Sequence, residues 1–76
     1  MIVRMKSSGR AGDAYARSQT ETRVYWPDTG QTEWIATREL DGYTSGHWHD
    51  LTDALESGQI TLFRHKERTR NLADSP

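Results

Sequence analysis

A turn signal, Pro-Asp-Thr-Gly, occupies positions 27 to 30 and lies between two runs of residues that suit β-strands. The flanking runs are rich in Thr, Val, Tyr, Trp and Ile, which favour a pleated surface. Proline, aspartate and glycine each favour the backbone angles of a tight turn. The stretch from about 20 to 38 therefore predicts a central β-hairpin, around which the rest of this 76-residue chain must be arranged.

The length of the loop decides which side chains share a face of this hairpin. A three-residue loop closed by Gly30 places Val24 opposite Trp34. We favour this register because it gathers Trp26 and Trp34 on one face, which is then the core. The other face then carries Arg23, Tyr25, Glu33, Ile35 and Thr37. A four-residue loop instead places Val24 opposite Glu33.

The composition of the chain argues against several classes of function. It has 10 basic and 11 acidic residues, and the formal net charge of -1 argues against a general binder of nucleic acid or anionic membranes. There is no cysteine, which excludes disulfides, thiolate metal sites and cysteine nucleophiles and fits a cytoplasmic protein. The N-terminus does not resemble a signal peptide, and no apolar run approaches the roughly 20 residues that cross a bilayer.

The remainder of the chain predicts one short helix and a closing strand. The helix is expected from about 50 to 57, with Asp50 or Thr52 as N-cap, Leu51 and Leu55 on one apolar stripe, and Gly58 after its end. The closing strand is expected from about 59 to 65. Three further segments are predicted as a short strand, a mobile loop and a turn: 1–6, 7–18 and 39–46. The polar segment 66–76 is predicted to be a disordered tail.

Together these elements predict an α+β domain over residues 1–65, with a small antiparallel sheet and one helix across a face. The expected core is thin: Val3, Val24, Trp26, Trp34, Ala36, Leu40, Trp48, Leu51, Leu55, Ile60 and Leu62. A small core favours a homodimer, which buries further surface against a second copy.

The predicted function is a non-enzymatic module that binds another protein. Its candidate binding residues are Tyr25, Ile35, Phe63 and Arg23, because aromatic anchors within a charged rim are typical of protein interfaces. The size of the chain fits a regulator or inhibitor encoded by a phage or another mobile element. Neither a cofactor nor a membrane is expected to take part.

The alternative is a nucleic-acid-binding protein. A continued C-terminal strand would place four cations on one face, where they could follow a phosphate backbone. These residues are Arg64, Lys66, Arg68 and Arg70.

Metal binding and catalysis have weaker support. His47 and His49 are two apart, so both imidazoles could reach one zinc ion, with Asp41, Asp50 or His65 as a further ligand. This spacing is common, and no metal is predicted. The sequence has no nucleophile elbow or phosphate-binding loop, so no enzyme is predicted.

Overall fold

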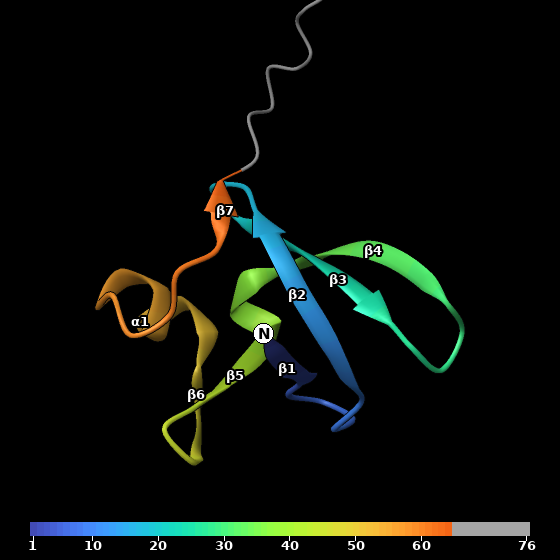
Figure 1. The fold of residues 1–76 in the computed structure, drawn as a ribbon, viewed down its shortest axis with the longest axis horizontal. Coiled ribbons are helices and arrows are strands. Elements are labelled where there is room, and N and C mark those ends of the chain that lie inside the picture. The colour runs from blue at the N-terminus through green and yellow to red at the C-terminus, as the bar shows by residue number, and fades with distance from the viewer. Residues whose placement is uncertain (65–76) are drawn as a thin grey trace, which may run out of the picture.

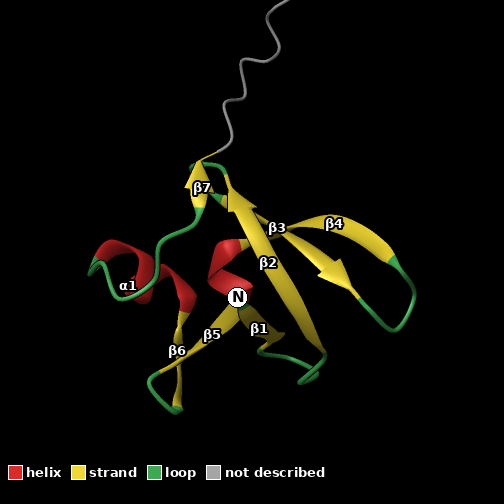
Figure 2. Ribbon diagram, in the orientation of Figure 1, coloured by secondary structure: helices red, strands yellow, loops and turns green. Residues whose placement is uncertain are grey.

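The computed structural model describes residues 1–64 of the 76-residue chain, and these form a seven-stranded sheet with one short α-helix (Figures 1 and 2). The elements in chain order are β1 (Ile2–Met5), β2 (Ala11–Arg17), β3 (Glu21–Trp26), β4 (Gln31–Ala36), the 3₁₀ helix η1 (Thr37–Glu39), β5 (Leu40–Thr44), β6 (His47–Asp50), α1 (Leu51–Glu56) and β7 (Phe63–Arg64). The predicted α+β class is confirmed in outline, although the described chain is mostly sheet.

The strands follow the order β4-β3-β2-β1-β5-β6, and each neighbouring pair is antiparallel. β7 lies outside this path and pairs in parallel with the end of β2. In Figure 1 the β3–β4 hairpin projects to one side of β2, while β5, β6 and α1 lie on the other. The predicted hairpin therefore forms one edge of the sheet, and its predicted central position is wrong because β1 and β2 are the middle strands.

β2 occupies most of the segment that the sequence predicts as a mobile loop over 7–18, and that prediction is wrong. Its residues alternate between the two faces of the sheet, as a strand requires. The buried positions are Gly12, Ala14 and Ala16. These small residues have weak strand propensity, but they allow β2 to pack closely beneath larger neighbours.

The hairpin turn contains four residues, 27 to 30, and sets the register of β3 and β4. The backbone N–H groups of Thr29 and Gly30 both donate to the carbonyl of Trp26, at 3.2 and 2.7 Å. Val24 consequently lies opposite Glu33, and Arg23 lies opposite Trp34. The favoured three-residue register is wrong, and the four-residue alternative is the one observed.

The core forms between the inner face of the sheet and α1. Its buried members are Val3, Ala14, Val24, Trp26, Leu40, Leu51, Ala54 and Ile60, with Met1, Met5, Ile35, Leu55 and Leu62 partly buried against them. Three expected core residues, Trp34, Ala36 and Trp48, are half-buried and do not belong to this core cluster. Trp34 and Ala36 differ from the prediction because the one-residue change in register moves them to the opposite face.

The second half of the chain contains a hairpin where a turn over 39–46 was predicted. β5 and β6 pair through a tight turn at Ser45 and Gly46, which both have positive φ angles of 54° and 81°. Such backbone angles are typical of the turns that close two-residue hairpins. The predicted helix is confirmed at Leu51–Glu56, and Gly58, with φ 84°, follows its end.

The predicted closing strand over 59–65 is reduced to the two residues of β7. Ile60 is buried in the core but lies outside any strand. The predicted tail, 66–76, lies outside the described residues. Over the part of the chain that the structure describes, no helix has the length and apolar character needed to cross a membrane.

Candidate protein-binding surface

Four side chains on the outer surface of β2, β3 and β4 form a cluster that we call the outer aromatic face: Tyr15, Arg23, Tyr25 and Trp34. Tyr15 is 46% exposed and Tyr25 is 40% exposed, whereas Trp34 is half-buried. They share this surface because Thr22, Val24 and Trp26 take the buried positions of β3, which leaves Arg23 and Tyr25 outside.

A β-bulge places Tyr15 in this cluster. The pairing of β2 with β3 shifts between Ala14 and Ala16, so that Tyr15 is an extra residue in the ladder. Such a bulge redirects a side chain and increases the local twist of the strands. Here it brings the phenol oxygen of Tyr15 within 2.8 Å of Arg23 Nε.

Arg23 is the centre of the outer aromatic face. Its Nε donates to Tyr15 Oη, and its Nη2 donates to Thr32 Oγ1 at 3.1 Å. The guanidinium carbon also lies 5.5 Å from the ring centroid of Trp34. These three contacts hold the guanidinium in place, yet none is with a carboxylate, and no acidic side chain of residues 1–64 forms an ion pair with Arg23. The face therefore presents a fixed positive charge between aromatic rings.

The structure brings together only some of the predicted binding residues. Arg23 and Tyr25 are neighbours on the outer aromatic face, but Ile35 points to the inner face and packs against the core. Phe63 is 73% exposed on β7, where its Cα partner is Ala16 of β2. Sequence reasoning missed Tyr15 and Trp34, which the alternation in β2 and the four-residue turn would have identified.

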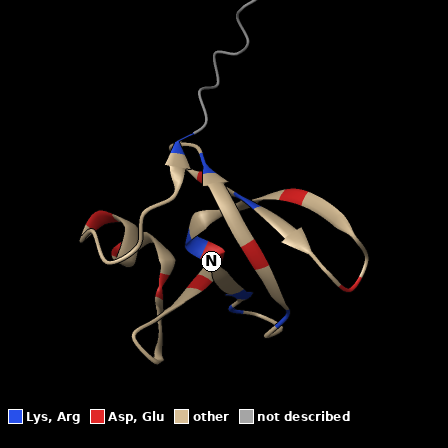
Figure 3. Ribbon diagram, viewed as in Figure 1, with Lys and Arg blue, Asp and Glu red and all other residues tan. Residues whose placement is uncertain are grey.

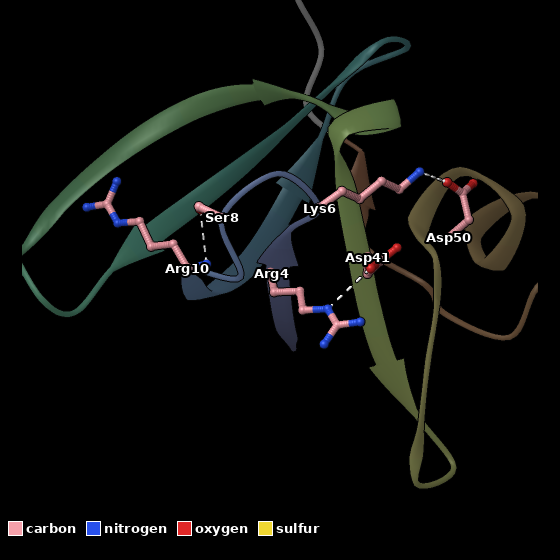
Figure 4. Close-up of polar contacts among 6 residues, drawn as sticks. All are labelled: Arg4, Lys6, Ser8, Arg10, Asp41 and Asp50. Carbon is pink, nitrogen blue, oxygen red and sulfur yellow. Dashed lines mark hydrogen bonds and ion pairs between the residues drawn. The ribbon is translucent and has the colours of Figure 1, made fainter.

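A second cluster lies at the opposite edge of the sheet, where Arg4 contacts Trp48 of β6. The guanidinium carbon of Arg4 is 4.3 Å from the Trp48 ring centroid, and Tyr43 meets the same ring edge-on at 5.1 Å. In contrast to Arg23, Arg4 is neutralised by Asp41, with Nε and Oδ2 3.2 Å apart (Figure 4). This cluster therefore resembles a self-contained structural contact more than a binding site.

Asp41 and Asp50 are direct neighbours across β5 and β6, an arrangement in which like charges repel. Arg4 and Lys6 of the N-terminal segment each pair with one of these carboxylates (Figure 4). The hydrogen bond from Lys6, followed by that from the Asp53 backbone N–H, lowers the pKa of Asp50 from its usual value. The same pair raises the pKa of Lys6.

Arg10 joins the segment after β1 to the hairpin turn and covers the core tryptophan. Its Nε and Nη2 form a two-pronged contact with the carboxylate of Asp28, at 3.0 and 2.9 Å. The guanidinium carbon lies 4.1 Å from the ring centroid of Trp26. The backbone N–H of Arg10 donates to Ser8 Oγ (Figure 4). The hydrogen bond from Arg10 lowers the pKa of Asp28.

Substitution of Asp50 is expected to separate its two roles, because it caps α1 by accepting the Asp53 N–H at 3.1 Å and also pairs with Lys6. Asp50→Ala removes both and should lower the free energy of unfolding at pH 7 by about 1 kcal/mol. Asp50→Asn retains a good cap, so its free energy of unfolding should fall by less. Urea denaturation monitored by circular dichroism gives both values, and equal losses in the two variants would contradict the role of the cap.

The free energies of unfolding of the same variants should also differ in their dependence on pH. A carboxyl group whose pKa is lowered by folding contributes stability above its unfolded pKa of about 3.9, and this contribution is lost as the pH falls through the folded pKa. Unfolding free energies measured from pH 7 to pH 3 should therefore decline less in Asp50→Asn than in the unmodified chain. Asp28, whose pKa is also lowered, accounts for part of the decline that remains.

The geometry gives less support to the candidate metal ligands and to the candidate nucleic-acid-binding residues than to the outer aromatic face. The rings of His47 and His49 are 6.3 Å apart between centroids, and no group of three or more potential ligands able to hold a metal lies within residues 1–64. Arg64 is exposed at the end of β7. Lys66, Arg68, Arg70 and the possible ligand His65 lie outside the described residues.

A scan against protein-family models, a search of curated proteins and a search of solved structures each found no match to this chain. What the chain binds must therefore be inferred from the chemistry of its own surface.

Proposed function

We propose that this chain is a small non-enzymatic module that binds another protein through the outer aromatic face. The observation that carries the proposal is the position of Arg23, which is fixed by the neutral side chains of Tyr15, Thr32 and Trp34. Arginine, tyrosine and tryptophan are the residues that most often dominate the binding energy of protein interfaces.

The chemistry of the face indicates what kind of partner it fits. A guanidinium has five N–H donors and commonly binds carboxylates through two parallel hydrogen bonds. Tyr15 and Thr32 accept hydrogen bonds from Arg23 without neutralising it. The proposed ligand is therefore a protein segment that presents an Asp or Glu side chain to Arg23, with apolar side chains against Tyr15 and Tyr25.

Preorganisation supports the same proposal. Binding normally requires long side chains to lose rotational freedom, at about 0.5–1.5 kcal/mol for each one immobilised. Arg23 is already restrained by two hydrogen bonds and by the ring of Trp34. A partner can therefore meet this arginine with little further loss of entropy.

The proposal is tested by capturing the partner from native bacterial lysate with the tagged chain, with and without nuclease, and then measuring its affinity for purified variants. Tyr25→Ala and Arg23→Gln should each weaken binding at least tenfold, as expected for interface hot spots of about 2 kcal/mol. Tyr43→Ala is the matched control, because Tyr43 is 43% exposed but belongs to β5, in the other half of the sheet. Native circular dichroism with unchanged affinity in the first two variants would refute the proposal.

The same experiment distinguishes the other occupants of this face. If the chain sediments as a dimer and Tyr25→Ala makes it monomeric, the face is a contact between two copies. Recovery of a partner that disappears with nuclease would favour the second proposal, nucleic-acid binding through the basic C-terminal stretch. The observation behind that second proposal is that Arg64 lies beside another cation, Arg17, on the neighbouring strand.

The biological setting belongs to the same proposal. A cytoplasmic regulator or inhibitor, encoded by a phage or another mobile element, is consistent with the length of 76 residues and the lack of cysteine. Identification of the captured partner tests this setting directly.

A further inference from the structure

The basic side chains within residues 1–64 divide into two groups. Four of them have side-chain partners: Arg4, Lys6, Arg10 and Arg23. The other three, Arg17, Arg38 and Arg64, have no hydrogen-bonding or ion-pair partner among the described residues. Unpaired cations are unremarkable when they are dispersed over a surface, but these three are close together.

Arg17 connects the three arginines in space. It is the Cα partner of Arg64, because β7 runs parallel to the end of β2. Figure 3 shows the two adjacent strand tips as basic segments. Arg17 also lines a cavity of about 260 Å³ together with Arg38 of η1. The register and the cavity therefore place positive charge at one end of the sheet from three separate elements.

The cavity lies where the β2–β3 loop, η1 and α1 meet. A backbone hydrogen bond of 2.9 Å from Thr37 to Thr20 ties two of its walls together. Its lining includes the hydroxyl-bearing residues Ser18, Thr20 and Thr52, together with the apolar Leu55. Hydroxyl groups and arginines are both donors to anionic oxygens. We call this space the Arg17–Arg38 cavity.

Arg17 itself is incompletely satisfied by the rest of the described chain at its Nε atom. This atom is buried and has no hydrogen-bond partner in residues 1–64. A buried donor without a partner is unfavourable, and more so when it belongs to a charged group. The neighbouring cation Arg64 adds repulsion of like charges. A bound anion would offset the repulsion between the two cations.

We propose that the Arg17–Arg38 cavity binds an oxyanion, a phosphate or carboxylate group carried by a small molecule. The guanidinium groups of Arg17 and Arg38 hold the oxygens, and Arg64 contributes attraction from the rim. Glu56 also lines the cavity and opposes a simple anion, although it can accept a hydrogen bond from a donor elsewhere on the ligand. This site is separate from the outer aromatic face and does not depend on the function proposed for that face.

The test is a titration of the ¹⁵N-labelled chain with sodium phosphate and, separately, with sodium acetate, at constant ionic strength set with sodium chloride. The backbone amide signals of residues 18–20 and 38 should shift and saturate. Arg17→Met and Arg38→Met should each weaken binding about tenfold or more, the usual effect of losing a charge-assisted hydrogen bond. Glu56→Gln should strengthen it.

Arg4→Gln is the control, because it removes one positive charge from a site outside the cavity. If Arg4→Gln lost as much affinity as Arg17→Met, the attraction would be non-specific and the proposal would be overturned. The absence of saturable shifts with both salts would also overturn it. Tighter binding of phosphate assigns a phosphorylated ligand, and tighter binding of acetate assigns a carboxylate.

The stability of Arg17→Met gives an independent readout. Without phosphate or acetate, this variant should melt at or above the temperature of the unmodified chain, because an unsatisfied buried donor has been removed. With saturating anion, the order should reverse, since only the unmodified chain gains stability from tight binding. If Arg17→Met melts lower under both conditions, Arg17 has a structural role and the proposal is wrong.

Discussion

Trp26→Ala is expected to unfold most of the chain at room temperature. The indole is 1% exposed, its Nε1 lies 3.3 Å from Glu33 Oε1, and Arg10 covers the ring. Loss of a buried tryptophan side chain generally lowers stability by about 3–5 kcal/mol. A core in a domain of this size supplies roughly the same amount, so little stability should remain. Far-ultraviolet circular dichroism and urea denaturation measure the result.

Trp34→Ala is the matched control, because it makes the same substitution eight positions along the chain, on the opposite face of the hairpin. Trp34 is half-buried and contributes a contact with Arg23, so this variant should remain folded, with a loss of about 1 kcal/mol. If the two alanine variants were equally damaged, both tryptophans would belong to one core. The three-residue register would then be correct.

One part of the outer aromatic face was predictable from the sequence, and another part was not. Arg23 and Tyr25 belong to the strand whose alternation is visible in the sequence, so their outward orientation does not depend on β4. The orientations of Trp34 and Ile35 depend on the register, which is set by two backbone hydrogen bonds in the turn. Both tryptophans need not be in the core, because an arginine can cover an indole ring on the surface, as Arg23 does for Trp34.

Local signals located the helix accurately because its limits depend on neighbouring residues. Asp50 caps its first turn, and Gly58 adopts a positive φ after its end. The pairing of β5 with β1 and of β7 with β2 joins segments that are distant in the chain. No local pattern specifies these partners, and for that reason the pairing of β7 with β2 and the central position of β1 and β2 in the sheet were not predicted.

The Arg17–Arg38 cavity is the feature that the sequence predicts least. Its lining comes from the end of β2 with the β2–β3 loop, from the 3₁₀ helix and from the α-helix, at 17–20, 37–38 and 52–56. No spacing in the sequence relates these segments, since each is positioned by a different part of the sheet. Only the folded chain shows that the Nε atom of the half-buried Arg17 is buried without a hydrogen-bond partner among the described residues.

Gly12→Ala is expected to have the second-largest effect, and it tests why β2 is made of small residues. An added Cβ would lie 2.6 Å from Val24 Cγ1 and 2.8 Å from Trp26 Cε3, both closer than carbon atoms can approach. Valine is stiff about χ1, and the indole is held by Arg10, so neither can move aside easily. Such overpacking should lower the free energy of unfolding by about 1–3 kcal/mol.

Gly42→Ala is the counterpart on β5, because Gly42 is also buried and its added Cβ would also meet the core. The nearest atoms there are Ile60 Cδ1 at 2.8 Å and Leu51 Cδ1 at 3.0 Å. Both are the ends of flexible side chains, which can rotate away, so the loss in urea denaturation should be smaller than in Gly12→Ala. A Gly12→Ala variant as stable as the unmodified chain would instead mean that β2 does not lie against Val24 and Trp26. The segment would then be closer to the mobile loop that its glycines and serines predict.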